Sequence, residues 1–253
     1  MAAGRGKGRV APQLIADLVS ANHILYDQGV VDAFGHVSAR HDKDPERFLL
    51  ARNMAPGLVT ADDIIEYHLD GTPIDDAGRS SYLERFIHGE VYRVRPDVMA
   101  VVHSHSPSVV PFSTVKAAPL RAMCHMAGFL GTTTPIYEIR DFAGEDSDLL
   151  ITDSRLGASL AQTLGDRSVV LMRGHGSTAV AGSLMSVVYR AVYTEINARM
   201  QSEALRLGPV NFLTAGEGRT AAKNIEGQGK RAWDLWKITA EIRCAALGAM
   251  LKA

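Results

Sequence analysis

The segment Met-Ala-Val-Val-His-Ser-His, residues 99–105, runs from apolar residues directly into two histidines. The apolar part predicts a buried strand that ends in polar residues. Alternate residues of a strand point to the same side, so His103 and His105 can both reach one ion. The segment therefore predicts a buried strand that carries metal-binding side chains at its end.

A third histidine follows another apolar run. His175 comes after Ser-Val-Val-Leu-Met-Arg, residues 168–173, and lies between Gly174 and Gly176. Glycines let the backbone turn tightly and approach a site closely. Three imidazoles around a divalent ion leave coordination positions open, as catalytic sites do. We expect His103, His105 and His175 to bind one ion; the alternative is that each is an ordinary core or surface histidine.

Upstream of the first strand, Ser81 to Val94 predicts an amphipathic helix that carries Glu84 and, one turn later, His88. A carboxylate on the site side of this helix is a metal ligand or a general acid/base. The spacing Ser81-x-x-Glu84 also matches a capping box, in which Glu84 only caps the helix start. The residues alone leave both interpretations open.

The remaining periodicities predict an α/β fold with helices flanking one sheet in three layers. Residues 12–253 are expected to form a single domain behind a disordered tail of residues 1–11, since a charged Gly-rich end cannot bury a core. The early strands resemble a meander, which predicts antiparallel pairing. Helices are expected at 12–28, after Pro107, at 156–164, at 184–206 and from about Glu217 to Leu247; further strands are expected within 31–40 and at 48–52, 149–153 and 168–176.

The composition narrows the class of protein. Hydrophobic residues make up 46% of the 253 residues, and the net charge is −1, so no basic field attracts nucleic acid. The two cysteines imply no disulfide framework. No apolar run approaches the roughly 20 residues that span a bilayer, and the start lacks a signal-peptide core. We therefore expect a cytoplasmic protein without a nucleic-acid or membrane partner.

Taken together, these motifs resemble the class II aldolase/adducin family over residues 12–210. The resemblance rests on Glu84-Arg85-Phe86-Ile87-His88, Arg95-Pro96-Asp97, Ala100-Val101-Val102-His103-Ser104-His105 and Arg173-Gly174-His175-Gly176. It implies a three-layer α/β/α domain with a mixed, mainly antiparallel sheet, and a metal held by the three histidines. The family has a glutamate nineteen residues before the first of them, which is the position of Glu84. The resemblance therefore favours a ligand or acid/base role over the cap.

The departures from the family pattern concern the substrate. Sugar-phosphate aldolases hold the phosphate with the Asn of Gly-Asn-Val-Ser and a Ser-Ser pair before the glutamate. Here Gly35-His36-Val37-Ser38 carries a histidine, and Tyr82-Leu83 precede Glu84. His36, Ser38 and Arg52 instead indicate binding of a carboxylate or phenolate, because Arg matches a carboxylate bidentately. Arg52 could equally be a plain surface residue.

A second catalytic candidate is His125, which falls near the place of a catalytic tyrosine in the aldolases; a packed histidine is the alternative. The chain is most similar to the decarboxylases of hydroxymethylpyridine dicarboxylate and dihydroxyphthalate. This similarity implies a carbon–carbon lyase that decarboxylates a hydroxylated aromatic or heteroaromatic (di)carboxylate. A class II aldolase, a non-catalytic adducin-like interaction domain and an iron-dependent oxygenase are the alternatives.

The ligand set suits manganese, zinc, iron or cobalt. The resemblance favours manganese, with one ion in each subunit, and a small-molecule substrate. It also implies a C4 homotetramer whose sites lie near the subunit interfaces.

Overall fold

The computed structural model describes residues 8–250, and its centre is a seven-stranded sheet in the order β3-β2-β1-β4-β7-β6-β5. All neighbouring strands are antiparallel except β5 and β6, which run parallel. The predicted α/β fold with a mixed, mainly antiparallel sheet is confirmed. The strands are β1 (His36–Arg40), β2 (Arg47–Ala51), β3 (Ile64–His68), β4 (Ala100–Ser104), β5 (Ile136–Tyr137), β6 (Val169–Met172) and β7 (Gly176–Ala181).

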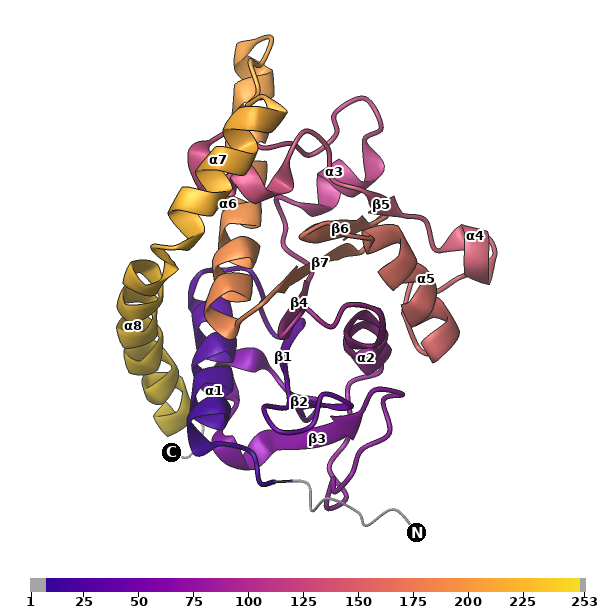
Figure 1. Cartoon of the computed structure of the whole chain (residues 1–253), viewed down its shortest axis with the longest axis vertical. Coiled ribbons are helices and arrows are strands. Elements are labelled where there is room, and N and C mark those ends of the chain that lie inside the picture. Colours follow the sequence, from indigo (N-terminus) through magenta and orange to yellow (C-terminus); the bar gives the residue numbers. More distant parts are fainter. Residues whose placement is uncertain (1–7, 251–253) are drawn as a thin grey trace.

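Helices cover both faces of the sheet. Figure 1 shows α1, α6 and α8 on one side and α2 and α5 on the other. The helices are α1 (Pro12–Asp27), α2 (Arg85–Val94), α3 (Val110–Thr114), α4 (Arg140–Ala143), α5 (Ser154–Leu164), α6 (Leu184–Leu207), α7 (Ala215–Glu226) and α8 (Gly229–Met250), with short 3-10 turns η1 (Pro56–Leu58), η2 (Ala61–Asp63) and η3 (His125–Leu130).

Strand alternation divides the core in two. In β4, Ala100 and Val102 face the cluster that includes α1 and α6, whereas Val101 faces the cluster that includes α2 and α5. These side chains are almost completely buried, and a fully buried valine contributes about 1.5–3 kcal/mol to stability. His103 lies two residues beyond Val101, so the same alternation turns its ring toward α2.

One predicted strand does not form, and β3, β5 and most of β7 are strands that the sequence pattern did not predict. Residues 149–153 form no strand, because Ile151 gives its backbone N–H to the carboxylate of Glu84 instead of to a neighbouring strand. The short β5 pairs with β6 in their place. Conversely, residues 177–181, for which no strand was predicted, form most of β7 and pair with both β4 and β6.

Two helix boundaries also differ from the prediction. The helix expected from Ser81 begins at Arg85, and Glu84 is its N-cap residue without a side-chain cap. The capping box does not form, because the Ser81 hydroxyl accepts a hydrogen bond from Tyr67. The expected C-terminal helix is two helices, α7 and α8, which are separated at residues 227–228.

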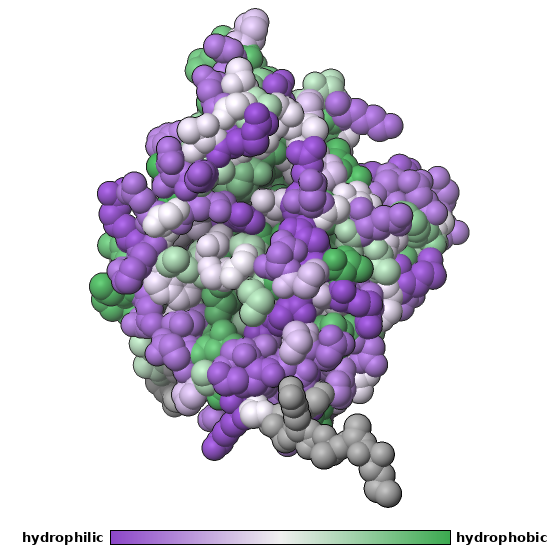
Figure 2. All heavy atoms as spheres, in the orientation of Figure 1, coloured by the Kyte–Doolittle hydropathy of each residue, from purple (hydrophilic) through white to green (hydrophobic). Residues whose placement is uncertain are grey.

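The predicted tail falls only partly within the described residues, since residues 1–7 lie outside them. Within residues 8–11, Val10 packs against the core. Figure 2 shows a face on which hydrophilic residues predominate, with hydrophobic side chains scattered between them. Among the helices of residues 8–250, none has both the length and the apolar character that crossing a membrane requires.

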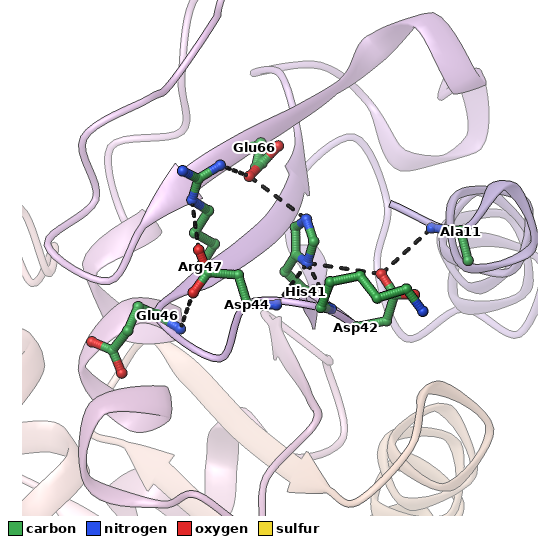
Figure 3. Close-up of polar contacts among 8 residues, drawn as sticks. Ala11, His41, Asp42, Asp44, Glu46, Arg47 and Glu66 are labelled. Carbon is green, nitrogen blue, oxygen red and sulfur yellow. Dashed lines mark hydrogen bonds and ion pairs between the residues drawn. The ribbon is translucent and has the colours of Figure 1, made fainter. Parts of the chain in front are cut away.

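A buried polar cluster fixes the turn between β1 and β2. Figure 3 shows His41 inside this turn, with Arg47 and Glu66 on one side and Asp42 on the other. His41 Nδ1 accepts hydrogen bonds from the backbone N–H groups of Lys43 (2.9 Å) and Asp44 (3.1 Å). The Arg47 guanidinium pairs with Glu66 at 2.6 Å. One imidazole therefore satisfies two backbone donors that the turn would otherwise leave without a partner.

Replacing His41 by alanine is expected to lower the free energy of unfolding by about 1–3 kcal/mol, because two backbone donors lose their acceptor. Urea denaturation followed by circular dichroism measures the change. His68→Ala is the matched control, since His68 lies exposed in the neighbouring β3 and its loss is expected to cost less than about 0.5 kcal/mol. Equal stability of the two variants would contradict this account of the turn.

Candidate metal centre

Four side chains converge where β4 ends. His105 Nε2 lies 3.0 Å from His103 Nε2 and 2.9 Å from His175 Nε2. Glu84 Oε2 lies 3.3 Å from His103 Nε2 and 3.5 Å from His175 Nε2. One ligand atom from each of the four groups lies within 4.8 Å of every other. The structure therefore brings Glu84 to the same point as the three histidines.

The arrangement fits a divalent cation. Imidazole nitrogens bind zinc at about 2.0–2.1 Å, which places tetrahedral ligand atoms roughly 3.4 Å apart. The separations of 2.9–3.5 Å are close to that value. Lone pairs that face one another at this range repel unless a proton or a cation lies between them. The donors suit zinc, iron, manganese or cobalt and do not separate these metals.

The backbone around the β6–β7 turn brings His175 to the site. Gly174 has a φ of 66°, which favours glycine. A Cβ atom at Gly176 would lie 2.0 Å from the carbonyl oxygen of Ser104, so no larger residue fits there. This close approach of β7 to the end of β4 places His175 beside His105.

The loop at residues 149–151 holds two of the four groups in place. His175 Nδ1–H donates to the carbonyl oxygen of Leu149 at 3.0 Å, which leaves Nε2 facing the cluster. The N–H of Ile151 donates to Glu84 Oε1 at 3.0 Å. Leu149 has a φ of 70°, a strained conformation for a residue with a side chain. Such outer contacts orient metal ligands and fix the tautomer of a histidine.

A buried carboxylate on α6 holds the segment that follows His105. Glu195 accepts hydrogen bonds from the hydroxyl of Ser106 and from the backbone N–H of Ser108 at 3.1 Å. His105 is thus fixed from both sides, by the end of β4 and by α6. Sequence reasoning did not identify Glu195, because its partners lie almost ninety residues earlier in the chain.

The charges favour a cation. Burial acts to raise the pKa of Glu84, but the neighbouring His103 and His175 hold that pKa well below its usual range. Burial, followed by His103 and His175, lowers the pKa of His105 to about 4. Burial opposes protonation of His175, but the hydrogen bond and charge of Glu84 raise its pKa. At neutral pH the cluster therefore holds an ionised carboxylate and a neutral His105.

Metal affinity is expected to fall as the pH drops through the raised pKa of His175. Below that pKa an incoming cation has to displace a proton from His175, which costs about tenfold in affinity per pH unit. Because the shift is upward, the decline is expected to begin above pH 6.5, the ordinary histidine value. Competition with a coloured chelator between about pH 5.5 and 8 measures the slope. An affinity that stays constant over this range would contradict the assignment.

His36 and Ser38 lie next to the cluster but differ in their surroundings. The His36 ring lies 5.1 Å from the His103 ring and 4.6 Å from the Tyr82 ring, centre to centre. Ser38 is fully buried, and its hydroxyl is hydrogen-bonded to His88 (2.6 Å) and Tyr92 (2.8 Å). This hydroxyl is therefore engaged inside the protein, and the expected contact of Ser38 with a substrate stays a prediction.

Arg52 and His125 lie outside the four-residue cluster. Arg52 Nε donates to Asp63 at 2.6 Å, and among the described residues no hydrogen bond engages its terminal nitrogens. A planar pair of donors is therefore left for a carboxylate. His125 is exposed at the start of η3, and within residues 8–250 it makes no contact with the cluster. A catalytic role for His125 stays a prediction.

The family profile described as "Class II Aldolase and Adducin N-terminal domain" matches residues 16–202. The chain is 40% identical over 245 residues to "Decarboxylase tropJ" of Talaromyces stipitatus, which covers 88% of this chain and 92% of that protein.

The chain also resembles a second decarboxylase in sequence and an aldolase in fold. The chain is 31% identical over 203 residues to a 3,4-dihydroxyphthalate decarboxylase of Arthrobacter keyseri, covering 74% of this chain and 77% of that one. Its fold matches L-fuculose 1-phosphate aldolase of Glaciozyma antarctica with a TM-score of 0.74 at 22% identity, covering 92% and 90% of the two chains.

Proposed function

Because this chain belongs to the class II aldolase and adducin family and is a carbon–carbon lyase, we propose that it is a metal-dependent decarboxylase of a hydroxylated aromatic or heteroaromatic (di)carboxylate. The observation that carries the proposal is the convergence of Glu84 with His103, His105 and His175. The similarity to decarboxylases over most of both chains favours decarboxylation over aldol cleavage.

His103, His105 and His175 would hold one divalent ion, for which we propose manganese, with zinc second. When bound, such an ion stabilises the negative charge on a substrate oxygen next to the breaking bond. Glu84 would complete the ligand set or act as acid/base beside it. The non-catalytic, adducin-like alternative is disfavoured, because a binding module has no need for four converging metal ligands.

Glu84 would move the proton that decarboxylation requires. Its neighbours keep it ionised, so it begins as an acceptor and takes the proton of the ortho hydroxyl group. Glu84 returns that proton to the ring carbon that carries the carboxylate, which gives the ketone form of the ring. The bond between this carbon and the carboxylate then breaks, carbon dioxide leaves, and the electron pair restores the aromatic ring as a phenolate. Solvent protonates the phenolate, and Glu84 is again a carboxylate.

Substrate recognition is proposed for His36 and Arg52. His36 lies against His103 and would donate to an anionic oxygen of the substrate. Arg52 is anchored through Nε, so its guanidinium is oriented while two nitrogens stay available. Aldolase-type phosphate binding is disfavoured, because His36 and Tyr82 stand where the phosphate-holding residues would lie.

Arg52→Met is expected to raise KM for a dicarboxylate about 10- to 100-fold, the value of a lost charge-assisted hydrogen bond. Arg93→Met is the matched control, because Arg93 likewise donates from Nε to one carboxylate, that of Glu90, and is exposed on α2. Steady-state carbon dioxide release measures both variants. An equal rise in KM from Arg93→Met would contradict a role of Arg52 in substrate binding.

The decisive experiment measures carbon dioxide, oxygen and aldehyde together. Metal-reconstituted protein is incubated with ortho-hydroxy aromatic carboxylates and dicarboxylates, and separately with aldol substrates. Metal-dependent carbon dioxide release without oxygen uptake is the expected result. If only the aldol substrates react and release an aldehyde, the protein is an aldolase. If oxygen is consumed, it is an oxygenase.

We further propose that residues 12–253 act as one catalytic domain in the cytoplasm and assemble as a C4 homotetramer, with sites near the subunit interfaces. The exposed apolar side chains of α8 support an assembly, since Leu235, Ile238 and Ile242 are each at least 60% exposed at helical spacing. Light scattering coupled to size exclusion tests the number of subunits.

A further inference from the structure

A continuous chain of buried polar groups runs from the candidate metal centre into the core. His36 Nδ1 lies 2.7 Å from His88 Nε2, and His88 Nδ1 lies 2.6 Å from Ser38 Oγ. Ser38 Oγ lies 2.8 Å from the hydroxyl oxygen of Tyr92. All four side chains are at least 96% buried. Each hydrogen that lies between two of these four groups therefore needs an acceptor inside the protein.

Two periodicities produce this chain. Alternation in β1 places His36 and Ser38 on the face that meets α2. The helical spacing of four places His88 and Tyr92 on the face of α2 that meets β1. Arg40, the next residue on the same face of β1, donates to the carbonyl of Tyr92 at 2.6 Å and stacks over its ring. The tyrosine at the end of the chain is therefore held in place.

The surroundings of Tyr92 set the direction of the hydrogen bonds. Within the part of the chain that the structure describes, Ser38 Oγ is the acceptor in reach of the Tyr92 hydrogen. Tyr92 therefore donates to Ser38, and Ser38 in turn donates to His88 Nδ1. His88 must then carry its hydrogen on Nε2 and donate it to His36 Nδ1.

We propose that His88 and Ser38 are positioning residues that hold His36 as the neutral tautomer with its hydrogen on Nε2, in a hydrogen-bonded chain whose far end is the Tyr92 hydroxyl. The opposite direction would leave the Tyr92 hydrogen without an acceptor in a buried position, which costs about 1–3 kcal/mol.

The hydrogen-bonded chain ends at His36 Nε2, and this nitrogen faces a place that solvent still reaches. His36 Nε2 has no hydrogen-bond partner among residues 8–250, yet it is absent from the fully buried unpaired atoms, which include His103 Nδ1. The site would thus offer an uncharged N–H donor beside the metal ligands. If the proposed function holds, this donor selects an anionic oxygen of the substrate. It rejects a substrate group that can only donate a hydrogen bond.

The test observes the tautomer directly, in the full-length protein loaded with diamagnetic zinc and without substrate. Magic-angle-spinning NMR of protein labelled with ¹⁵N-histidine separates Nε2–H from Nδ1–H rings by their nitrogen shifts, and His36→Gln identifies the His36 signals. We expect the Nε2–H form. An Nδ1–H or doubly protonated His36 overturns the proposal, whatever the protein catalyses.

Two variants probe the direction of the chain. Ser38→Ala removes the donor to His88 Nδ1, so His36 is expected to show a mixture of tautomers. Tyr92→Phe leaves Ser38 able to donate to His88, so the Nε2–H form is expected to persist. A tautomer that changes in Tyr92→Phe but not in Ser38→Ala overturns the assigned direction. Thermal denaturation confirms that both variants are folded.

Kinetics link the tautomer to the substrate. Ser38→Ala is expected to raise KM for the carboxylate substrate about 3- to 10-fold, the value of one neutral hydrogen bond, with a smaller change in kcat. Ser159→Ala is the matched control, a buried serine on α5 that bonds to Tyr137. A KM in Ser38→Ala equal to that of the control, with the Nε2–H tautomer confirmed, would remove His36 from substrate binding and leave the tautomer assignment standing.

Discussion

His103→Ala is expected to lose the bound metal and carbon dioxide release together. His103 is completely buried, and its Nε2 lies within 3.3 Å of ligand atoms from both His105 and Glu84. Removing even an outer contact of a metal ligand costs about 10- to 100-fold in affinity, so loss of a ligand is expected to exceed about 100-fold. Metal content after dialysis against a weak chelator, together with turnover, measures the effect.

The control for His103→Ala is His68→Ala, which removes an imidazole from an exposed position on β3. That variant is expected to keep its metal and its turnover. Full metal content in His103→Ala would refute the candidate centre. Loss of metal without any change in the reaction would instead support a protein that does not need the ion for its chemistry.

The positions of the ligands were predictable where the signal is local. His103 lies near the end of β4 and His105 directly after it, so the alternation of the strand, continued by one residue, predicts that both rings face one side. For His175 the two glycines indicated a tight turn, and the structure gives the reason at Gly176, where a side chain would collide with Ser104. Glu84 could not be separated from a helix cap by spacing, because the contact of Ser81 with Tyr67 depends on the packing of a distant strand.

What the sequence did not reveal depends on contacts between distant segments. Residues 149–153 have the apolar pattern of a strand, but the backbone of Leu149 and Ile151 is used to hold His175 and Glu84. The spacings of His36 with Ser38 and of His88 with Tyr92 are visible in the sequence. The hydrogen bonds among these four side chains form only when α2 packs on β1, which joins residues about fifty positions apart.

Glu84→Gln is expected to lower kcat about 10²- to 10⁴-fold, the usual contribution of a general acid/base, while much of the metal is retained. The amide has nearly the shape of the carboxylate, and its oxygen still accepts from the N–H of Ile151, so the start of α2 is expected to stay in place. The three imidazoles remain to hold the ion. The amide cannot accept the proton of a substrate hydroxyl and return it to the ring carbon.

Metal content and kcat, measured on the same preparation of Glu84→Gln, separate the two roles of this carboxylate. Retained metal with lost turnover assigns Glu84 to proton transfer, because the ion alone then does not suffice. Loss of both in parallel, with turnover restored by excess metal, assigns Glu84 to the ligand set. Turnover close to that of the unaltered protein, with its metal intact, would exclude both roles. The proton would then have to come from another group, and among the described residues His36 is the side chain next to the ligands with an unpaired nitrogen that solvent reaches.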